Sequence, residues 1–125
     1  MKEKLFELLE NSYAPYSNCK VACIVETTDG SLYKGVNVEN ASYGGTICAE
    51  RNAINAAITD GKKEFKALYL TSNKNHFVMP CSICKQSMLE FFDDKVLFYI
   101  INNEEEKILT FEEILNTKFT KDDLK

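Results

Sequence analysis

Residues 46–51 read Thr-Ile-Cys-Ala-Glu-Arg, and residues 80–84 read Pro-Cys-Ser-Ile-Cys. Each stretch places a cysteine where a helix is expected to begin, and a glutamate follows the first cysteine by two residues. Zinc binds sulfur donors well, and a catalytic zinc site keeps its fourth position for water instead of a fourth protein ligand. The sequence therefore predicts one zinc ion per chain, held by Cys48, Cys81 and Cys84, with Glu50 beside it.

The positions of these thiols suit metal binding, because a thiol must lose its proton to bind zinc. The N-terminus of a helix provides a positive field and free N–H donors, which lower the pKa of a thiol. Cys84 lies one helical turn after Cys81 and therefore faces the same way. Three thiolates around one zinc ion leave a negative cluster, and we expect Arg51 to offset part of that charge. Glu50 is expected to move protons at the centre and not to complete the ligand set.

The segments on either side of the two cysteine motifs alternate between helical and strand patterns. Apolar residues at helical spacing predict helices over 2–9, 47–59 and 82–92, with Thr46 as the cap of the second and a helical turn at 111–115. Apolar or β-branched runs predict strands over 20–27, 31–38, 65–71, 95–101 and 108–110. This order predicts an α/β fold in which helices cover a mixed sheet, with the motifs following strands on neighbouring parallel units. The strongly apolar run at 95–101 is expected to be the central strand.

The composition is that of a globular chain of 125 residues, expected to form a single domain over residues 1–125. The net charge of −4 and the pI of about 5.1 disfavour nucleic acid as a partner, because polyanion binding needs clustered lysine and arginine. A small-molecule substrate is the better expectation. The charged N-terminus is unlike a signal peptide, and no apolar run approaches the ~20 residues of a membrane span. We therefore expect a cytoplasmic protein without a membrane partner, in which cysteines serve metal chemistry and not disulfides.

Four blocks of the chain occur in an order that points to one family. They are YAPYS at 13–17, GVNVENASYG at 35–44, CAER at 48–51, and PCSICKQ at 80–86. Together they closely resemble the small, homotetrameric, zinc-dependent cytidine deaminases of pyrimidine salvage, over about residues 5–124. The resemblance implies a three-layer α-β-α fold with a mixed five-stranded sheet. It also implies hydrolytic deamination of cytidine and 2′-deoxycytidine to uridine and 2′-deoxyuridine, with release of ammonia and one zinc ion per subunit.

The resemblance also implies substrate contacts, at Asn37, Glu39, Ala49, Ala41, Tyr43 and Phe119. The first two would hydrogen-bond the ribose 3′-hydroxyl, and a strand places such alternate residues on one side. The backbone of Ala49 would contact the base, and Glu50 would shuttle protons to it. The last three are similar to residues that reach the site of a neighbouring subunit, so that a homotetramer would complete each pocket.

The chain departs from the family pattern at a few positions. Cys19 stands where the family usually has an aromatic that stacks on the base, and a thiol has no π-face. Ala22-Cys23 replaces the usual Gly-Ala pair, which implies tighter local packing. Ser82 and Lys85 stand where glycine and arginine are common. Because lysine lacks the planar fork of arginine, charge balance at the thiolates would fall more heavily on Arg51.

Two other functions stay open at the level of the sequence. One is a non-catalytic zinc module in which Cys19 or Cys23 joins Cys81 and Cys84 in a closed site, although this leaves Glu50 without a task. The other is deamination of a base within RNA or DNA, or of a modified nucleoside such as blasticidin S. The low pI argues against a polynucleotide, and so does a residue pair suited to a free 3′-hydroxyl.

Some of these residues also have simpler interpretations. Glu50 in a first helical turn could merely favour the helix dipole, and Asn37 and Glu39 could be turn formers at the end of a strand. His76, the only histidine, lies in a polar loop and is expected to be solvated.

Overall fold

The computed structural model describes residues 1–124. The elements, in chain order, are α1 (Lys2–Leu9), β1 (Val21–Thr27), β2 (Leu32–Val36), the 3-10 turn η1 (Tyr43–Gly45), α2 (Ala49–Thr59), β3 (Phe65–Ser72), α3 (Ser82–Phe91), β4 (Leu97–Ile101), β5 (Glu106–Thr110), α4 (Phe111–Ile114) and the 3-10 turn η2 (Lys121–Leu124). The predicted helices and strands are therefore all present. None of the described helices is long and apolar enough to cross a membrane.

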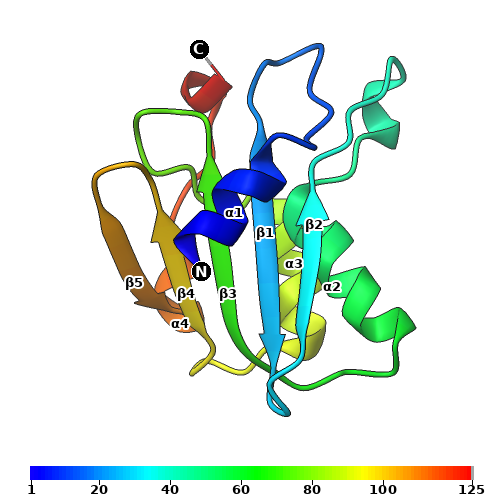
Figure 1. The fold of residues 1–125 in the computed structure, drawn as a ribbon, viewed down its shortest axis with the longest axis vertical. Helices are drawn as coiled ribbons and strands as arrows, with labels where there is room; N and C mark the ends of the chain where they lie inside the picture. Colours follow the sequence, from blue (N-terminus) through cyan, green and yellow to red (C-terminus); the bar gives the residue numbers. More distant parts are fainter. Residues whose placement is uncertain (125) are drawn as a thin grey trace.

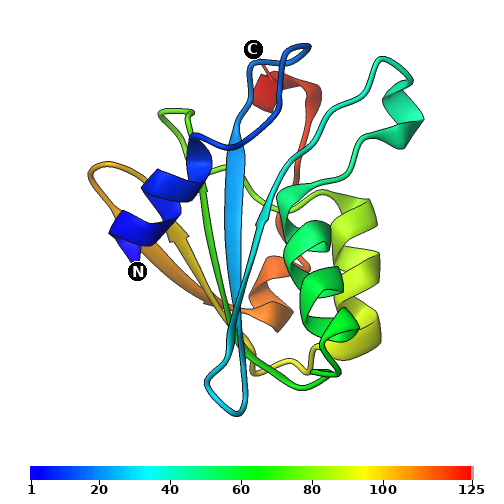
Figure 2. The ribbon, with the colours of Figure 1, turned by 45° about the vertical axis from the view of Figure 1, so that its right-hand side comes forward.

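One mixed sheet contains all of these strands, in the order β2-β1-β3-β4-β5. Only β3 and β4 pair in parallel; the other neighbours are antiparallel. Helix α1 lies on one face of the sheet, and α2 and α3 lie side by side on the other (Figures 1 and 2). The predicted α/β class and its three layers are confirmed.

Two details of the predicted topology were wrong. The central strand is β3, and β4 lies between β3 and β5. The reason is that residues 106–110 form a full strand, which pairs along the whole of β4 and takes the edge. The motifs also do not follow adjacent strands: β2 and β3 run in the same direction, but β1 separates them.

The main core fills the space between the sheet and its helices α2, α3 and α4. Aromatic rings dominate one end of it, where Phe98 and Phe111 stack with centroids 5.7 Å apart and Phe92 meets Phe98 edge to face. A smaller core on the opposite face is formed by Leu5 of α1 against strand residues such as Ile24. The two faces together hold the sheet rigidly, which fixes the helix starts that carry the cysteines.

Strand β2 and helix α2 approach each other very closely at Gly35. A Cβ atom there would lie 2.4 Å from the carbonyl oxygen of Ala49 and 2.4 Å from the amide nitrogen of Ala53. Only a residue without a side chain allows this distance. Gly35, the first residue of the GVNVENASYG block, thus sets how near the first turn of α2 lies to the sheet.

Candidate active site

The three predicted zinc ligands meet at the starts of two helices. Cys48 is the N-cap residue of α2 and Cys81 that of α3, while Cys84 lies in the first turn of α3. The expected cap of α2 was wrong: Thr46 instead accepts a hydrogen bond from the backbone of Asn40. The Cys48 sulfur lies 3.8 Å from that of Cys81, which lies 3.5 Å from that of Cys84.

These distances fit a shared metal ion. All three sulfur atoms lie within 4.8 Å of one another, and none is in a disulfide. Ligands on a tetrahedral zinc with Zn–S bonds of about 2.3 Å are about 3.8 Å apart. The donor set is therefore suited to zinc in both chemistry and spacing, and these thiols leave the fourth corner of a tetrahedron to another group.

The closed structural site considered above is not supported by the geometry. Among the described residues, the cluster that could hold a metal contains Cys48, Cys81 and Cys84, and neither Cys19 nor Cys23. Cys23 is fully buried in β1, within the main core.

The thiols differ in acidity because they share hydrogen bonds. Bonds from Cys48 and then Cys84 lower the pKa of the Cys81 thiol, and backbone N–H groups at the start of α3 add to this. The bonds with Cys48 and Cys81 raise the pKa of the Cys84 thiol, and the bond with Cys81 raises that of the Cys48 thiol. The expected lowering of the thiol pKa at a helix start is therefore found at Cys81 but not at Cys48, whose hydrogen bond with Cys81 acts in the opposite direction.

Arg51 lies against this cluster. Its Nη2 atom is 3.6 Å from the Cys48 sulfur and 3.5 Å from the carbonyl oxygen of Thr46. Its Nε atom is buried and has no hydrogen-bond partner among the described residues. Lys85, in contrast, donates to the carbonyl of Thr117, in the segment after α4. Of these two cations, Arg51 is thus the one with a hydrogen bond to a ligand sulfur.

Glu50 is the acidic group of the centre. It lies in the first turn of α2 and is only 5% exposed. Burial raises the pKa of its carboxyl group to about 7, and the charge of Cys81 acts in the same direction. A carboxyl group with such a pKa can both accept and release a proton near neutral pH, which is what a proton shuttle requires.

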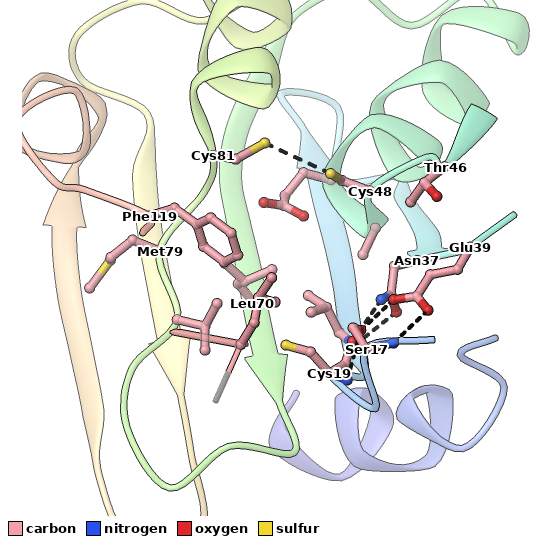
Figure 3. Close-up of a pocket in the computed structure, with 15 residues that line it drawn as sticks. Ser17, Cys19, Asn37, Glu39, Thr46, Cys48, Leu70, Met79, Cys81 and Phe119 are labelled. Atoms are coloured by element: carbon pink, nitrogen blue, oxygen red, sulfur yellow. Dashed lines mark hydrogen bonds between the residues drawn. The ribbon is translucent and has the colours of Figure 1, made fainter. Parts of the chain in front are cut away.

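A pocket opens beside the cysteines, and residues of the loop before β1, of the loop before α3 and of the C-terminal segment line it (Figure 3). Most of its wall is apolar, with a few polar groups. The lining residues are Ser17, Cys19, Val21, Asn37, Glu39, Thr46, Cys48, Ala49, Glu50, Leu70, Val78, Met79, Cys81, Phe119 and Leu124. Such a mixture is typical of a small-molecule site.

The pocket brings together most of the residues named from the sequence, but not all. Asn37 and Glu39 both line the pocket, although they come just after strand β2 and are not part of the strand. Phe119 lines the pocket of its own chain. Tyr43 is 75% exposed and lines an adjoining cavity that shares Glu39, and Ala41 lies on the exposed loop next to it.

Several lining residues had no signal in the sequence. Val78 and Met79 come from the loop before the second cysteine motif, to which no functional role was assigned from the sequence. Ser17 belongs to the YAPYS block, which is one of the four blocks that carry the family resemblance, but the sequence assigned Ser17 no role. His76, outside the pocket lining, is exposed as predicted, but its Nε2 atom also lies 3.0 Å from a carboxylate oxygen of Asp123, a contact that joins its loop to the C-terminal segment.

Comparison with known proteins agrees with this geometry. The profile described as cytidine and deoxycytidylate deaminase zinc-binding region matches residues 1–100. A cytidine deaminase from Mycoplasma genitalium is 36% identical over 121 residues, which is 95% of this chain and 92% of the relative. One from Mycoplasma pneumoniae is 40% identical over 119 residues, covering 93% and 89%. The crystal structure of cytidine deaminase from Burkholderia pseudomallei matches with a TM-score of 0.84 at 34% identity, covering 94% of each chain. The chain belongs to the cytidine and deoxycytidylate deaminase family, and the prediction of a zinc-binding deaminase fold is confirmed.

Proposed function

We propose that this protein catalyses the hydrolytic deamination of cytidine, and also of 2′-deoxycytidine, to the corresponding uridine with release of ammonia. The observation that carries the proposal is the cluster of three thiols at two helix starts, two of which line a largely apolar pocket together with a buried carboxyl group. Family membership supports the same conclusion. In this role the protein would act in pyrimidine salvage in the cytoplasm, with residues 1–125 as one catalytic domain.

The metal centre would be formed by Cys48, Cys81 and Cys84. Zinc held by these thiols would lower the pKa of a water molecule and so would supply the nucleophile near neutral pH. Arg51 would offset part of the thiolate charge through its bond to the Cys48 sulfur. Without this partner, three thiolates would leave the centre more negative, and the pKa of the water would be lowered less.

Glu50 would carry the protons of the reaction. Its carboxylate takes a proton from the water that adds to C4 of cytosine and delivers it to N3. It then passes a second proton from the new C4 hydroxyl to the exocyclic nitrogen, and the C4–N bond breaks to release ammonia. A pKa of about 7 suits this cycle, because the same group must be base and acid in turn.

The remaining polar groups would hold the nucleoside. The backbone of Ala49 would contact the base, and Asn37 and Glu39 would bind the ribose 3′-hydroxyl; in support, all three residues line the pocket. A carboxylate at that end of the pocket disfavours a 3′-phosphate, because the two negative charges would repel each other. This supports a free nucleoside over a base within a polynucleotide.

We further propose a homotetramer with shared active sites. Tyr43 is highly exposed yet lines a cavity that adjoins the pocket and shares Glu39 with it. A neighbouring subunit would then supply or receive residues such as Ala41 and Tyr43. Phe119 lines the pocket from its own chain, so in this proposal it contacts the base from there.

The direct test is ammonia release from cytidine by the purified, zinc-loaded protein. We expect stoichiometric ammonia and uridine, turnover of 2′-deoxycytidine as well, and weak competition by an oligonucleotide that contains cytosine. A folded, zinc-loaded protein that leaves cytidine unchanged would contradict the proposal. Strong competition by the oligonucleotide would instead favour a polynucleotide substrate.

A further inference from the structure

The carboxylate of Glu39 is held by the loop before β1. Its Oε1 atom accepts hydrogen bonds from the backbone N–H of Tyr16, at 2.9 Å, and of Ser17, at 3.1 Å. Its Oε2 atom accepts a hydrogen bond from the hydroxyl of Ser17. Hydrogen bonds to a charged acceptor are stronger than neutral ones. The loop thus fixes both oxygens of a carboxylate that lines the pocket.

The Ser17 hydroxyl is engaged in two directions. While it donates to Glu39, it accepts a hydrogen bond from the backbone N–H of Cys19 at 3.0 Å. The carbonyl oxygen of Cys19 in turn accepts from the side-chain amide of Asn37 at 2.8 Å. These residues lie together along one side of the pocket in Figure 3. One hydroxyl therefore connects the carboxylate on the sugar side of the proposed site with the loop that brings Cys19 to the wall.

The backbone of this loop has an unusual conformation at Asn18, and a hydrogen bond from Asn73 supports it. Asn18 has a φ of 57°, in the left-handed region that few residues other than glycine adopt without cost. Its carbonyl oxygen accepts a hydrogen bond from the side chain of Asn73 at 2.9 Å. The backbone N–H of Tyr16, before Ser17, and the carbonyl of Asn18, after it, are thus both hydrogen-bonded. These contacts hold the loop, and with it the Ser17 hydroxyl, in place.

We infer that Ser17 is a positioning residue for Glu39 and so determines recognition of the ribose 3′-hydroxyl; this rests on the proposed function. A carboxylate oxygen has two acceptor sites. With one site of Oε2 taken by Ser17, the second stays oriented for a substrate hydroxyl. Loss of the Ser17 hydroxyl leaves Oε1 held by the backbone but Oε2 without its anchor. It also leaves the N–H of Cys19 without its acceptor.

The test compares Ser17→Ala with wild-type enzyme on two nucleosides, cytidine and 3′-deoxycytidine. We expect the variant to raise KM for cytidine by roughly tenfold or more, as for a lost hydrogen bond to a charged group, and to change kcat little. KM for 3′-deoxycytidine, which lacks the hydroxyl in question, should change far less. Ser17→Thr is the matched control: it keeps the hydroxyl and should restore the preference for cytidine.

The outcomes separate this inference from the function on which it rests. A wild-type enzyme that turns over neither nucleoside would overturn the proposed function. In an active enzyme, an equal rise of KM for both nucleosides, or no rise for either, would overturn the role of Ser17 alone. A fall in kcat for both nucleosides with unchanged KM would do the same, because it would point to a general disturbance of the metal centre.

Discussion

At the scale of single residues, Glu50 is the group on which the proposed chemistry depends most. Its carboxyl is buried, its pKa is raised to about 7, and it lines the same pocket as two of the thiols. Glu50→Gln keeps the size of the side chain but removes its ability to carry a proton. We expect turnover of cytidine to fall by roughly 10²–10⁴-fold, while zinc content and folding stay unchanged.

The measurement is ammonia release together with zinc content in the same preparation. Glu90→Gln provides the control, because Glu90 is an exposed carboxylate on α3, away from the pocket lining. Activity of Glu50→Gln within a few-fold of wild type would show that another group moves the protons.

The spacing of cysteines and glutamate in the sequence was enough to predict which residues cluster here. It could not predict the hydrogen bonds among loop residues. Ser17 and Glu39 are far apart in the chain, and their contact follows only from the path of the loop over the end of β2. The pair formed by His76 and Asp123 was missed for the same reason, since a solvated loop residue and a tail residue carry no pattern that joins them.

At the scale of elements, the close approach of β2 and α2 determines where Cys48 and Glu50 lie. Gly35→Ala would force a Cβ atom into the backbone of the first turns of α2. We expect a loss of about 1–3 kcal/mol in the free energy of unfolding, as for overpacked cores, and reduced activity because the helix start moves. Gly44→Ala is the control, since nothing lies within 4 Å of a Cβ atom there. Urea denaturation of the two variants should differ clearly; equal stability would contradict the packing argument.

The sheet itself carries a pH-sensitive contact at Tyr69. Its hydroxyl donates to Glu26 at 2.9 Å, and its ring stacks on that of Tyr99 with centroids 4.7 Å apart. Burial, and then the bond to Glu26, raise the pKa of Tyr69 to about 12. The pKa of a tyrosine in the unfolded chain is about 10. The folded chain therefore holds the phenol proton more tightly, and the protonated phenol stabilises the fold. This contribution is complete below about pH 10 and is lost as the pH rises towards 12.

Denaturation of wild-type protein and Tyr69→Phe, at pH 8 and at about pH 11, tests this difference. We expect the free energy of unfolding of the wild type to fall more steeply with pH than that of Tyr69→Phe. Parallel pH profiles would show that Tyr69 titrates alike in the folded and unfolded chains.

The existence and type of the elements were predictable, because each has a clear apolar period. Their order in the sheet was less so. The central place was assigned to 95–101 on its hydrophobicity, but the mixed residues of 106–110 form the edge strand and leave β3 in the centre. Position in a sheet depends on pairing partners, which the pattern of a single strand does not encode.

At the scale of the whole molecule, the proposed tetramer predicts that subunits share active sites. Glu50→Gln and Tyr43→Ala would each weaken the enzyme, but at different parts of a shared pocket. When the two variants are co-expressed, some hybrid pockets contain both intact residues. We therefore expect the mixture to exceed the mean activity of the two variants expressed separately. Activity equal to that mean would show that each pocket is complete within one chain.

The central claim is that Cys48, Cys81 and Cys84 hold a zinc ion on which turnover of cytidine depends. Its most direct test measures zinc per chain and ammonia release in the same samples, before chelation, after chelation and after zinc is returned. We predict one zinc ion per chain at the start, loss of activity in proportion to loss of zinc, and recovery of both on readdition. Full turnover by folded protein from which the zinc has been removed would contradict the claim.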